Sequence, residues 1–121
     1  MLEGDTKVDG REVEVETLSP VKPAWFHILL SLSREPMHGF RIRESVETRT
    51  EGKVRLWPAT LYGALREMTE LGLIEPLVGE DDPDDDARRQ YHDLTGRGRE
   101  LLRYEADRLQ SLVDAVRAAQ G

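Results

Sequence analysis

The sequence predicts a mainly α-helical protein with a small β-hairpin. Apolar residues recur at helical spacing in several stretches, and two short β-type stretches flank an acidic turn near residue 80. At 121 residues, with 38% hydrophobic and 34% charged residues, the chain has the length of one domain with a modest core. Chains of this size often complete their apolar burial by oligomerising.

The composition also argues against a membrane protein and against a secreted protein. No stretch approaches the roughly 20 apolar residues of a membrane span, and the acidic N-terminus lacks the apolar segment of a signal peptide. The chain has no cysteine, which excludes disulfides and thiolate metal sites. We therefore expect a cytoplasmic protein with no membrane contact.

The first 19 residues are polar and show no helical apolar period. Valine and glutamate alternate over residues 11–17, which permits a short edge strand, but a flexible acidic arm is the favoured interpretation. Pro20 and Pro23 then mark the start of a helix, since proline is tolerated in a first turn.

Two helices are expected next. Residues 24–33 (AWFHILLSLS) are apolar on most sides, as in a helix that is buried against several partners. Pro36 and Gly39 end this run, and the helix that follows directs three apolar residues inward: Phe40, Ile42 and Val46. A turn at 50–53 and a short strand at 53–56 lead to the third helix.

The stretch 57–77 is the most informative part of the chain. Pro58 opens a helix whose inward face repeats at helical spacing, with Leu61, Ala64, Leu65, Met68 and Leu71. Gly72 supplies its C-terminal stop. The opposite face carries small or hydrogen-bonding groups: Ala59, Thr60, Tyr62, Gly63, Arg66 and Glu70.

Two strands, 73–78 and 88–94, enclose the acidic run GEDDPDDD (79–86), and Thr95 then caps a helix that extends to about residue 119. Three helices followed by a hairpin is the order of a winged helix-turn-helix, whose third helix enters the DNA major groove and whose hairpin is the wing. We predict a flexible arm over 1–19, this domain over 20–94 with its wing at about 73–94, and a C-terminal dimerisation helix over 95–121.

Four motifs in this order resemble the PadR family of bacterial transcriptional regulators: PMHGF (36–40), WPATLY (57–62), LGLIE (71–75) and RRQYHDLTGRGRELL (88–102). The resemblance implies a DNA-binding repressor that dimerises through its last helix, from the smaller size class with a single C-terminal helix. The chain departs from the family pattern at its wing tip, which is acidic where many wings are basic, and at three further places. Trp57 stands where a capping serine is frequent, Gly63 where arginine is frequent, and Gly96-Arg97 replaces Pro-Glu.

The net charge of −7 is concentrated in two segments. Residues 1–19 carry −4 and residues 79–86 carry −6, which leaves +1 on 20–78 and +2 on 87–121. The acidic balance therefore does not exclude a nucleic-acid partner. Because phosphate repels carboxylates, the run 79–86 is expected to point away from DNA or to stay mobile.

The predicted DNA surface combines phosphate-binding groups with short side chains that reach bases from a helix N-terminus. Arg66 is expected to contact guanine or phosphate, and Thr60 and Tyr62 to use their hydroxyls, with packing on the wing as the alternative for Tyr62. His38 is expected to stabilise its turn. The remaining candidates allow close approach or bind phosphate: Ala59, Gly63, Lys53, Arg55, Arg88 and Arg89.

The last helix carries an apolar stripe of six residues: Leu101, Leu102, Leu109, Leu112, Val113 and Val116. A monomer has few surfaces to cover it, so we expect a homodimer, with packing on the first helix also open to it. Two recognition helices about 34 Å apart would then read a pseudo-palindrome. The resemblance also implies a small hydrophobic or aromatic effector, with ordinary core packing as the simpler role for its candidate contacts: Trp25, Phe26 and Tyr104.

The sequence therefore predicts a regulator, in particular a repressor, that binds double-stranded DNA as a homodimer and is released by such an effector. The alternative is a winged-helix protein-interaction module without DNA binding, which the acidic wing and Gly63 favour. We expect no enzyme, because His27, His38 and His92 are far apart and no phosphate loop or nucleophile motif occurs. No cofactor or metal is expected, since the Asp run lacks the glycine and final glutamate of an EF-hand loop.

Overall fold

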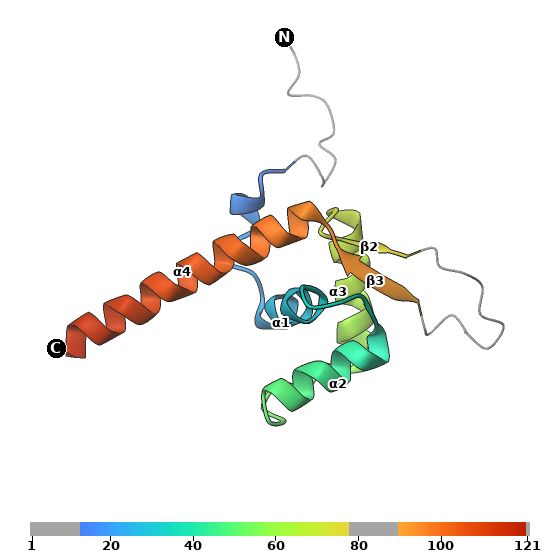
Figure 1. Cartoon of the computed structure of the whole chain (residues 1–121), viewed down its shortest axis with the longest axis horizontal. Coiled ribbons are helices and arrows are strands. Elements are labelled where there is room, and N and C mark those ends of the chain that lie inside the picture. Colours follow the sequence, from blue (N-terminus) through green and yellow to red (C-terminus); the bar gives the residue numbers. More distant parts are fainter. Residues whose placement is uncertain (1–12, 78–89, 121) are drawn as a thin grey trace, which may run out of the picture.

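The computed structural model describes residues 13–77 and 90–120 (Figure 1). A short 3-10 helix, η3 (Val15–Leu18), precedes α1 (Pro23–Leu32), β1 (Met37–His38) and α2 (Gly39–Arg49). These are followed by α3 (Pro58–Glu70), β2 (Ile74–Pro76), β3 (Tyr91–Leu94) and the long α4 (Gly96–Gln120). The predicted class, mainly α-helical with a small β-hairpin, a winged helix-turn-helix order and a long C-terminal helix, is confirmed.

The three strands form one antiparallel sheet in the order β1-β3-β2. In the wing hairpin Pro76 pairs with His92, and Met37 of β1 pairs with the same residue from the other side. The sequence did not predict β1, because two residues are too few to show a period-two pattern. The strand expected at 53–56 is wrong, since this segment is a loop that the Thr50 Oγ1 holds by accepting from the N–H of Val54 at 3.0 Å.

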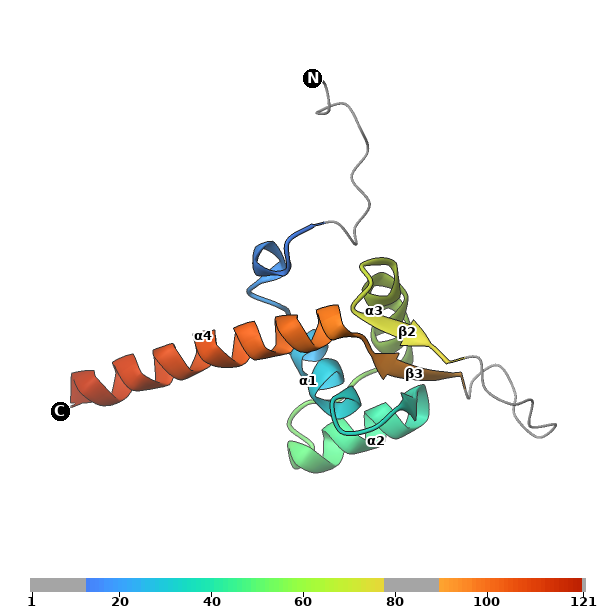
Figure 2. The ribbon, with the colours of Figure 1, turned by 45° about the horizontal axis from the view of Figure 1, so that its top comes forward.

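The core lies where the first three helices meet the sheet and the start of α4 (Figure 2). From α1 it takes Ile28, Leu29 and Leu32, all fully buried. From α2 it takes Ile42 and Val46, whose i,i+4 spacing puts them on one side of the helix. The inward orientation predicted for Phe40 is wrong, because a residue two positions before Ile42 points to the opposite side, and Phe40 is 61% exposed.

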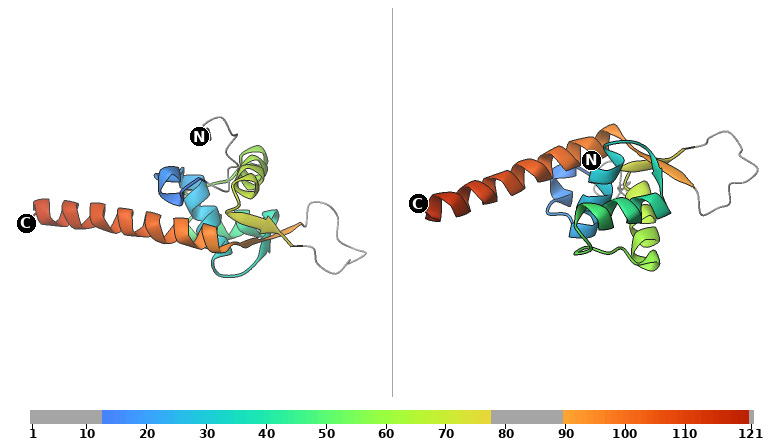
Figure 3. Two further views of the ribbon diagram at one scale, coloured as in Figure 1. Left: turned by 90° about the horizontal axis from the view of Figure 1, so that it is seen from above. Right: turned by 60° about the horizontal axis from the view of Figure 1, so that its bottom comes forward.

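The long helix α4 begins at a capped and closely packed junction. The Thr95 Oγ1 accepts from the N–H of Gly98 at 3.0 Å, which confirms the predicted cap. Arg97 donates through its Nε to the carbonyl of Leu71 at 2.9 Å, at the C-terminal end of α3, where the helix dipole favours a cation. The first turns of α4 contact α1 and η3, and the remainder extends away from the domain (Figure 3).

The N-terminal segment is tied to α4 in its described part. One turn of η3 buries Val15 and packs against α4, so residues 13–17 do not form the edge strand that was the alternative to a flexible arm. The carboxylate of Glu105 accepts from the Ser19 hydroxyl and from the N–H of Val21, the latter at 3.0 Å. Residues 13–19 are therefore packed rather than a free arm, and residues 1–12 of the predicted arm lie outside the described ranges.

Candidate nucleic-acid interface

The helix α3 presents one face to the core and the opposite face to solvent. Four of the five residues predicted to point inward are buried on this helix: Leu61, Ala64, Leu65 and Met68. The fifth, Leu71, lies just beyond the end of α3 and is half-buried. The predicted contact residues Ala59, Thr60, Tyr62 and Arg66 are exposed, and Gly63 is half-buried with open space where a Cβ would lie. The helical period thus separates the core face from a continuous outward face.

The outward face begins at the N-terminus of α3. Trp57 is the N-cap residue, makes no side-chain capping hydrogen bond and is 63% exposed, while Pro58 occupies the first turn. The N–H groups of Ala59 and Thr60 lie in this turn, where a helix offers them no acceptor. Together with the positive end of the helix dipole they suit a phosphate oxygen.

Two cavities border this face. One of about 320 Å³ lies between α3 and the wing and is lined by Tyr62, Leu65, Arg66, Thr69, Glu70, Pro76, Gln90 and His92. The other, about 260 Å³, lies between α3 and the start of α1 and is lined by Lys22, Ala24, Trp25, Ala59, Thr60, Gly63, Ala64, Arg66 and Glu67. Arg66 is exposed and borders both cavities, so it lies at the crest of the outward face between them.

A cation that the sequence reasoning missed lies beside this face. The Nζ of Lys22 is 5.9 Å from the centre of the Trp25 ring, within the range of a cation–π interaction. Both residues line the α1 side of α3 together with Thr60. The only signal for Lys22 in the sequence is its place directly before the helix-opening Pro23.

The three candidate effector residues occupy different surroundings. Trp25 lies under Lys22 beside α3, and Phe26 is half-buried with its ring edge-on to His27 at 6.1 Å between ring centres. Tyr104 is 42% exposed on α4. The cavity beside Trp25 is lined by neither of the other two residues, so this cavity does not bring the candidate set together.

The loop between α2 and α3 carries two of the predicted phosphate contacts. Lys53 and Arg55 are both exposed. The Nε of Arg55 is 3.2 Å from the Glu47 Oε2, an ion pair in which both side chains are at least half exposed. Such a pair exchanges readily with solvent or phosphate, so it leaves Arg55 available to DNA.

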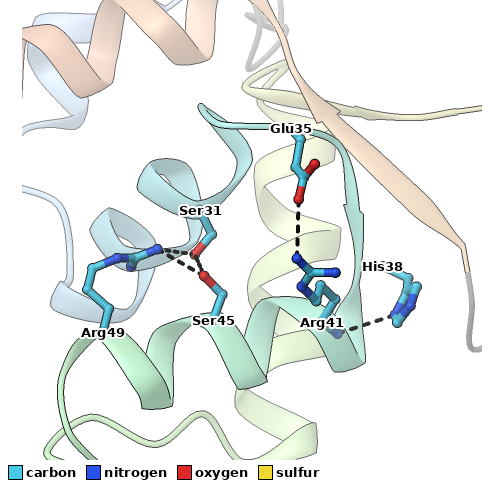
Figure 4. A network of polar contacts seen from close by, with 6 residues as sticks. All are labelled: Ser31, Glu35, His38, Arg41, Ser45 and Arg49. Carbon is cyan, nitrogen blue, oxygen red and sulfur yellow. Dashed lines mark hydrogen bonds and ion pairs between the residues drawn. The ribbon is translucent and has the colours of Figure 1, made fainter.

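The start of α2 confirms the role predicted for His38. Its Nδ1 accepts from the N–H of Arg41 at 3.3 Å, which caps the helix (Figure 4). Tyr62 packs against the next residue, since a Cβ on Gly39 would lie 2.9 Å from the Tyr62 hydroxyl oxygen. Tyr62 also borders the wing. Its side chain is therefore partly packed, as in the alternative interpretation, and is still exposed to solvent, as the predicted DNA contact requires.

A polar clamp fixes α2 against α1. The Arg49 Nη2 donates to the Ser31 Oγ at 2.9 Å and to the Ser45 Oγ at 3.0 Å (Figure 4). Burial, and secondarily the charge of Arg34, lower the pKa of Arg49. Burial, and secondarily the charge of Arg49, also lower the pKa of His27, which favours its neutral form beside the clamp.

Part of the predicted wing lies outside the described residues, including the acidic run 79–86, Arg88 and Arg89. In the described part of the wing, Gln90 bridges the two strands by donating from its Nε2 to the carbonyl of Leu77 at 2.9 Å. His92 is half-buried at the pairing of β3 with its two neighbours, and burial lowers its pKa. The lowered pKa favours the neutral form of His92.

The apolar stripe of α4 divides in two. Leu101 is fully buried in the chain's own core and Leu102 is half-buried against it, so the assignment of Leu101 to a dimer contact is wrong. The first turns meet α1 and η3, which take up this end of the stripe. The remaining four residues are exposed by 37–56%: Leu109, Leu112, Val113 and Val116.

The possible metal-ligating side chains of the described ranges are spread over several elements. Within residues 13–77 and 90–120, no three His, Cys, Asp or Glu side chains come together in a group that could hold a metal ion. The three histidines lie in α1, at the start of α2 and in β3. Among the helices in this part of the chain, none combines the length and apolarity needed to cross a lipid bilayer.

Comparison with known proteins agrees with this geometry. Residues 28–104 match the sequence profile described as "Transcriptional regulator PadR-like family". The chain is 35% identical over 89 residues to an uncharacterized 37.1 kDa protein in transposon TN4556 of Streptomyces fradiae. This match covers 74% of the chain but only 24% of that curated relative, so the chain spans about a quarter of its length.

Solved structures share the fold. A PadR family transcription regulator from Clostridium difficile R20291 superposes with a TM-score of 0.67 at 21% identity, covering 83% of this chain and 100% of the other. A PadR-like transcription factor from Bacteroides fragilis superposes with a TM-score of 0.64 at 23% identity, covering 78% and 87%.

Proposed function

The chain belongs to the PadR-like family of transcriptional regulators, and from this premise we propose that it is a repressor that binds a pseudo-palindromic DNA operator as a homodimer. The observation that carries the proposal is the outward face of α3. Its N-terminal turn offers N–H donors, Thr60 offers a hydroxyl and Arg66 a guanidinium group, while the opposite face is fully occupied by the core. This is the arrangement that a recognition helix needs in the major groove.

The groups around α3 suit the DNA backbone. Lys22 flanks the helix on the α1 side, and Lys53 and Arg55 lie just before it. Phosphate contacts from such groups would fix the register, and Arg66 and Thr60 would read base edges. We also propose that Arg88 and Arg89 contact the backbone from the wing.

We expect Arg66→Ala to weaken binding to the operator about 10-fold or more, since it removes the cation at the crest of the face. The magnitude of the slope of log K against log salt concentration should fall by about 1 if the lost contact is to a phosphate. Fluorescence anisotropy with a labelled duplex from the DNA upstream of the gene, at several salt concentrations, measures both quantities.

The matched control is Arg103→Ala, which removes the same charge from an exposed position on α4 and should change affinity less than twofold. If Arg66→Ala binds as the wild type does, the assignment of the α3 face fails. If the wild type binds no duplex at low salt and instead retains a protein partner, the protein-interaction alternative replaces the proposal.

Dimerisation is proposed to use the exposed end of the α4 stripe. Leu109, Leu112, Val113 and Val116 share one side of a helix that protrudes from the domain. Apolar side chains in this pattern find no cover within the described chain, and a second α4 is self-complementary to them.

We expect Leu112→Asp to convert the dimer to a folded monomer, because it would bury a carboxylate from each copy in the apolar interface. The dimer dissociation constant should rise by about 100-fold or more. Sedimentation velocity reports the oligomeric state, and circular dichroism checks the fold. Ser111→Asp, on the opposite side of α4 and also exposed, should remain dimeric. A dimeric Leu112→Asp would contradict this interface.

Three further parts of the proposal follow from family membership. The protein acts in the cytoplasm, has no enzymatic activity and is released from DNA by a small hydrophobic or aromatic effector. We retain Phe26 and Tyr104 as proposed effector contacts. Phe26 lies on α1 and Tyr104 on α4, and these two helices contact each other. Trp25 is better placed beside α3.

A further inference from the structure

Four rings gather at the start of α2 and form what we name the aromatic patch: His38, Phe40, Tyr62 and Tyr91. The ring centres of His38 and Tyr91 are 5.1 Å apart in an edge-to-face arrangement, and those of His38 and Phe40 are 6.4 Å apart with nearly parallel planes. Tyr62 packs over Gly39, the residue between His38 and Phe40. Four elements, β1, α2, α3 and β3, thus contribute to one surface (Figure 4 shows His38 beside β3).

The patch is exposed in spite of its apolar content. Phe40 is 61% exposed, and Tyr62 and Tyr91 are each 41% exposed. The other large exposed apolar side chains of the described residues are Trp57 and the group on α4: Tyr104, Leu109, Leu112, Val113 and Val116. An exposed Phe at this level, grouped with further aromatic rings, is typical of a surface that meets a partner.

The polar atoms of the patch can act as hydrogen-bond donors. Since the Nδ1 of His38 accepts from the N–H of Arg41, its Nε2 carries the hydrogen in the neutral ring and is a donor. The hydroxyls of Tyr62 and Tyr91 are donors as well. A surface of ring carbons with N–H and O–H donors fits deoxyribose and phosphate, because the sugar packs on the rings and the donors meet phosphate oxygens.

The position of the aromatic patch beside the α3 face and the wing indicates which partner it binds. Tyr62 lies on the same side of α3 as Arg66, with which it lines one cavity, and Tyr91 begins the returning strand of the wing. The patch is therefore continuous with the outward face of α3 and with the wing root. Resting on the function proposed above, we propose that the aromatic patch holds the sugar–phosphate backbone of the operator through uncharged contacts.

One experiment distinguishes the contribution of Phe40 to DNA binding from that of Arg66. Anisotropy titrations of the full chain use the labelled upstream duplex and a scrambled duplex of equal length, each at several salt concentrations. We expect Phe40→Ala to weaken binding to both duplexes by the same factor, about 5- to 20-fold, with the salt slope unchanged, because no charge is lost. Tyr91→Phe, which removes only a hydroxyl, should weaken both about twofold to fivefold.

Thr48→Ala is the control, since Thr48 is exposed farther along α2 and its loss should leave both affinities unchanged. An affinity of Phe40→Ala within twofold of the wild type, while Arg66→Ala is impaired, would overturn the inference and leave the proposed function standing. Weakening confined to the upstream duplex would assign the patch to base readout and overturn the backbone assignment. Absence of binding by the wild type would overturn both proposals.

Discussion

Replacement of Gly98 by alanine should strongly destabilise the fold, because the added methyl group has no room. A Cβ at this position would lie 2.1 Å from the carbonyl oxygen of Leu73 and 2.7 Å from the Cδ1 of Leu94. The Leu73 carbonyl cannot retreat easily, because it accepts from the N–H of Thr95 at 3.1 Å and from the Thr95 hydroxyl at 2.9 Å. The first turn of α4 would have to separate from the sheet.

We expect Gly98→Ala to lower the free energy of unfolding by about 3 kcal/mol or more, the upper range of overpacking effects. For a domain of this size the melting temperature should then fall by on the order of 10–20 °C. Urea denaturation and thermal melts followed by circular dichroism measure these quantities.

Gly96→Ala is a matched control in the same turn of α4, since nothing lies within 4 Å of a Cβ built there. Alanine is the better helix former, so this variant should be as stable as the wild type or slightly more stable. Equal stability of the two variants would show that the close approach of α4 to Leu73 does not constrain the fold.

The second large effect concerns Glu105, a carboxylate that is 1% exposed. It accepts from the Arg108 Nε and Nη2, both at 2.9 Å, from the N–H of Val21 at 3.0 Å and from the Ser19 hydroxyl. The hydrogen bonds from Arg108 are the largest cause that lowers the pKa of Glu105 from 4.5 to about 2; those from Ser19 and Val21 add to the shift, and burial opposes it.

We expect Glu105→Gln to lower the free energy of unfolding at pH 7 by about 3 kcal/mol, the amount that corresponds to this pKa difference. The N-terminal segment should also loosen, because Ser19 and Val21 lose their charged acceptor. Urea denaturation measures the first effect, and amide hydrogen exchange at Val21 measures the second.

The same substitution should alter the response to acid. A carboxyl group whose pKa is lowered on folding stabilises the fold above its unfolded pKa, and this contribution is lost as the pH falls through the folded pKa. The stability difference between wild type and Glu105→Gln should therefore be full above about pH 5 and shrink as the pH falls toward 2.

Glu100→Gln is the control on the same helix, where the side chain is exposed, and its stability should stay within about 0.5 kcal/mol of the wild type. A stability difference for Glu105→Gln that is independent of pH would mean that the Glu105 charge is not the source of the effect. Loss of shape complementarity alone would then explain it.

Much of the fold and one face of the site could be predicted from the sequence because their signals are local. Proline marks the starts of α1 and α3, and Gly72 follows the end of α3. The spacing of Leu61, Ala64, Leu65 and Met68 established both the helix and its outward face. The cap of α4 by Thr95 could also be predicted, because it involves residues only three positions apart. These features depend on residues within one or two turns of each other.

Other features were decided by contacts between residues far apart in the chain, which no local period reveals. Glu105 and Ser19 are 86 positions apart, and only their meeting turns part of a predicted free arm into a packed segment. The core ends between Leu101 and Leu109, which separates an intrachain contact from an exposed stripe on one helix. The packing of the helices likewise leaves Phe40 exposed and brings Lys22 beside α3. Burial is a property of the assembled surfaces, and the sequence records only which residues are apolar.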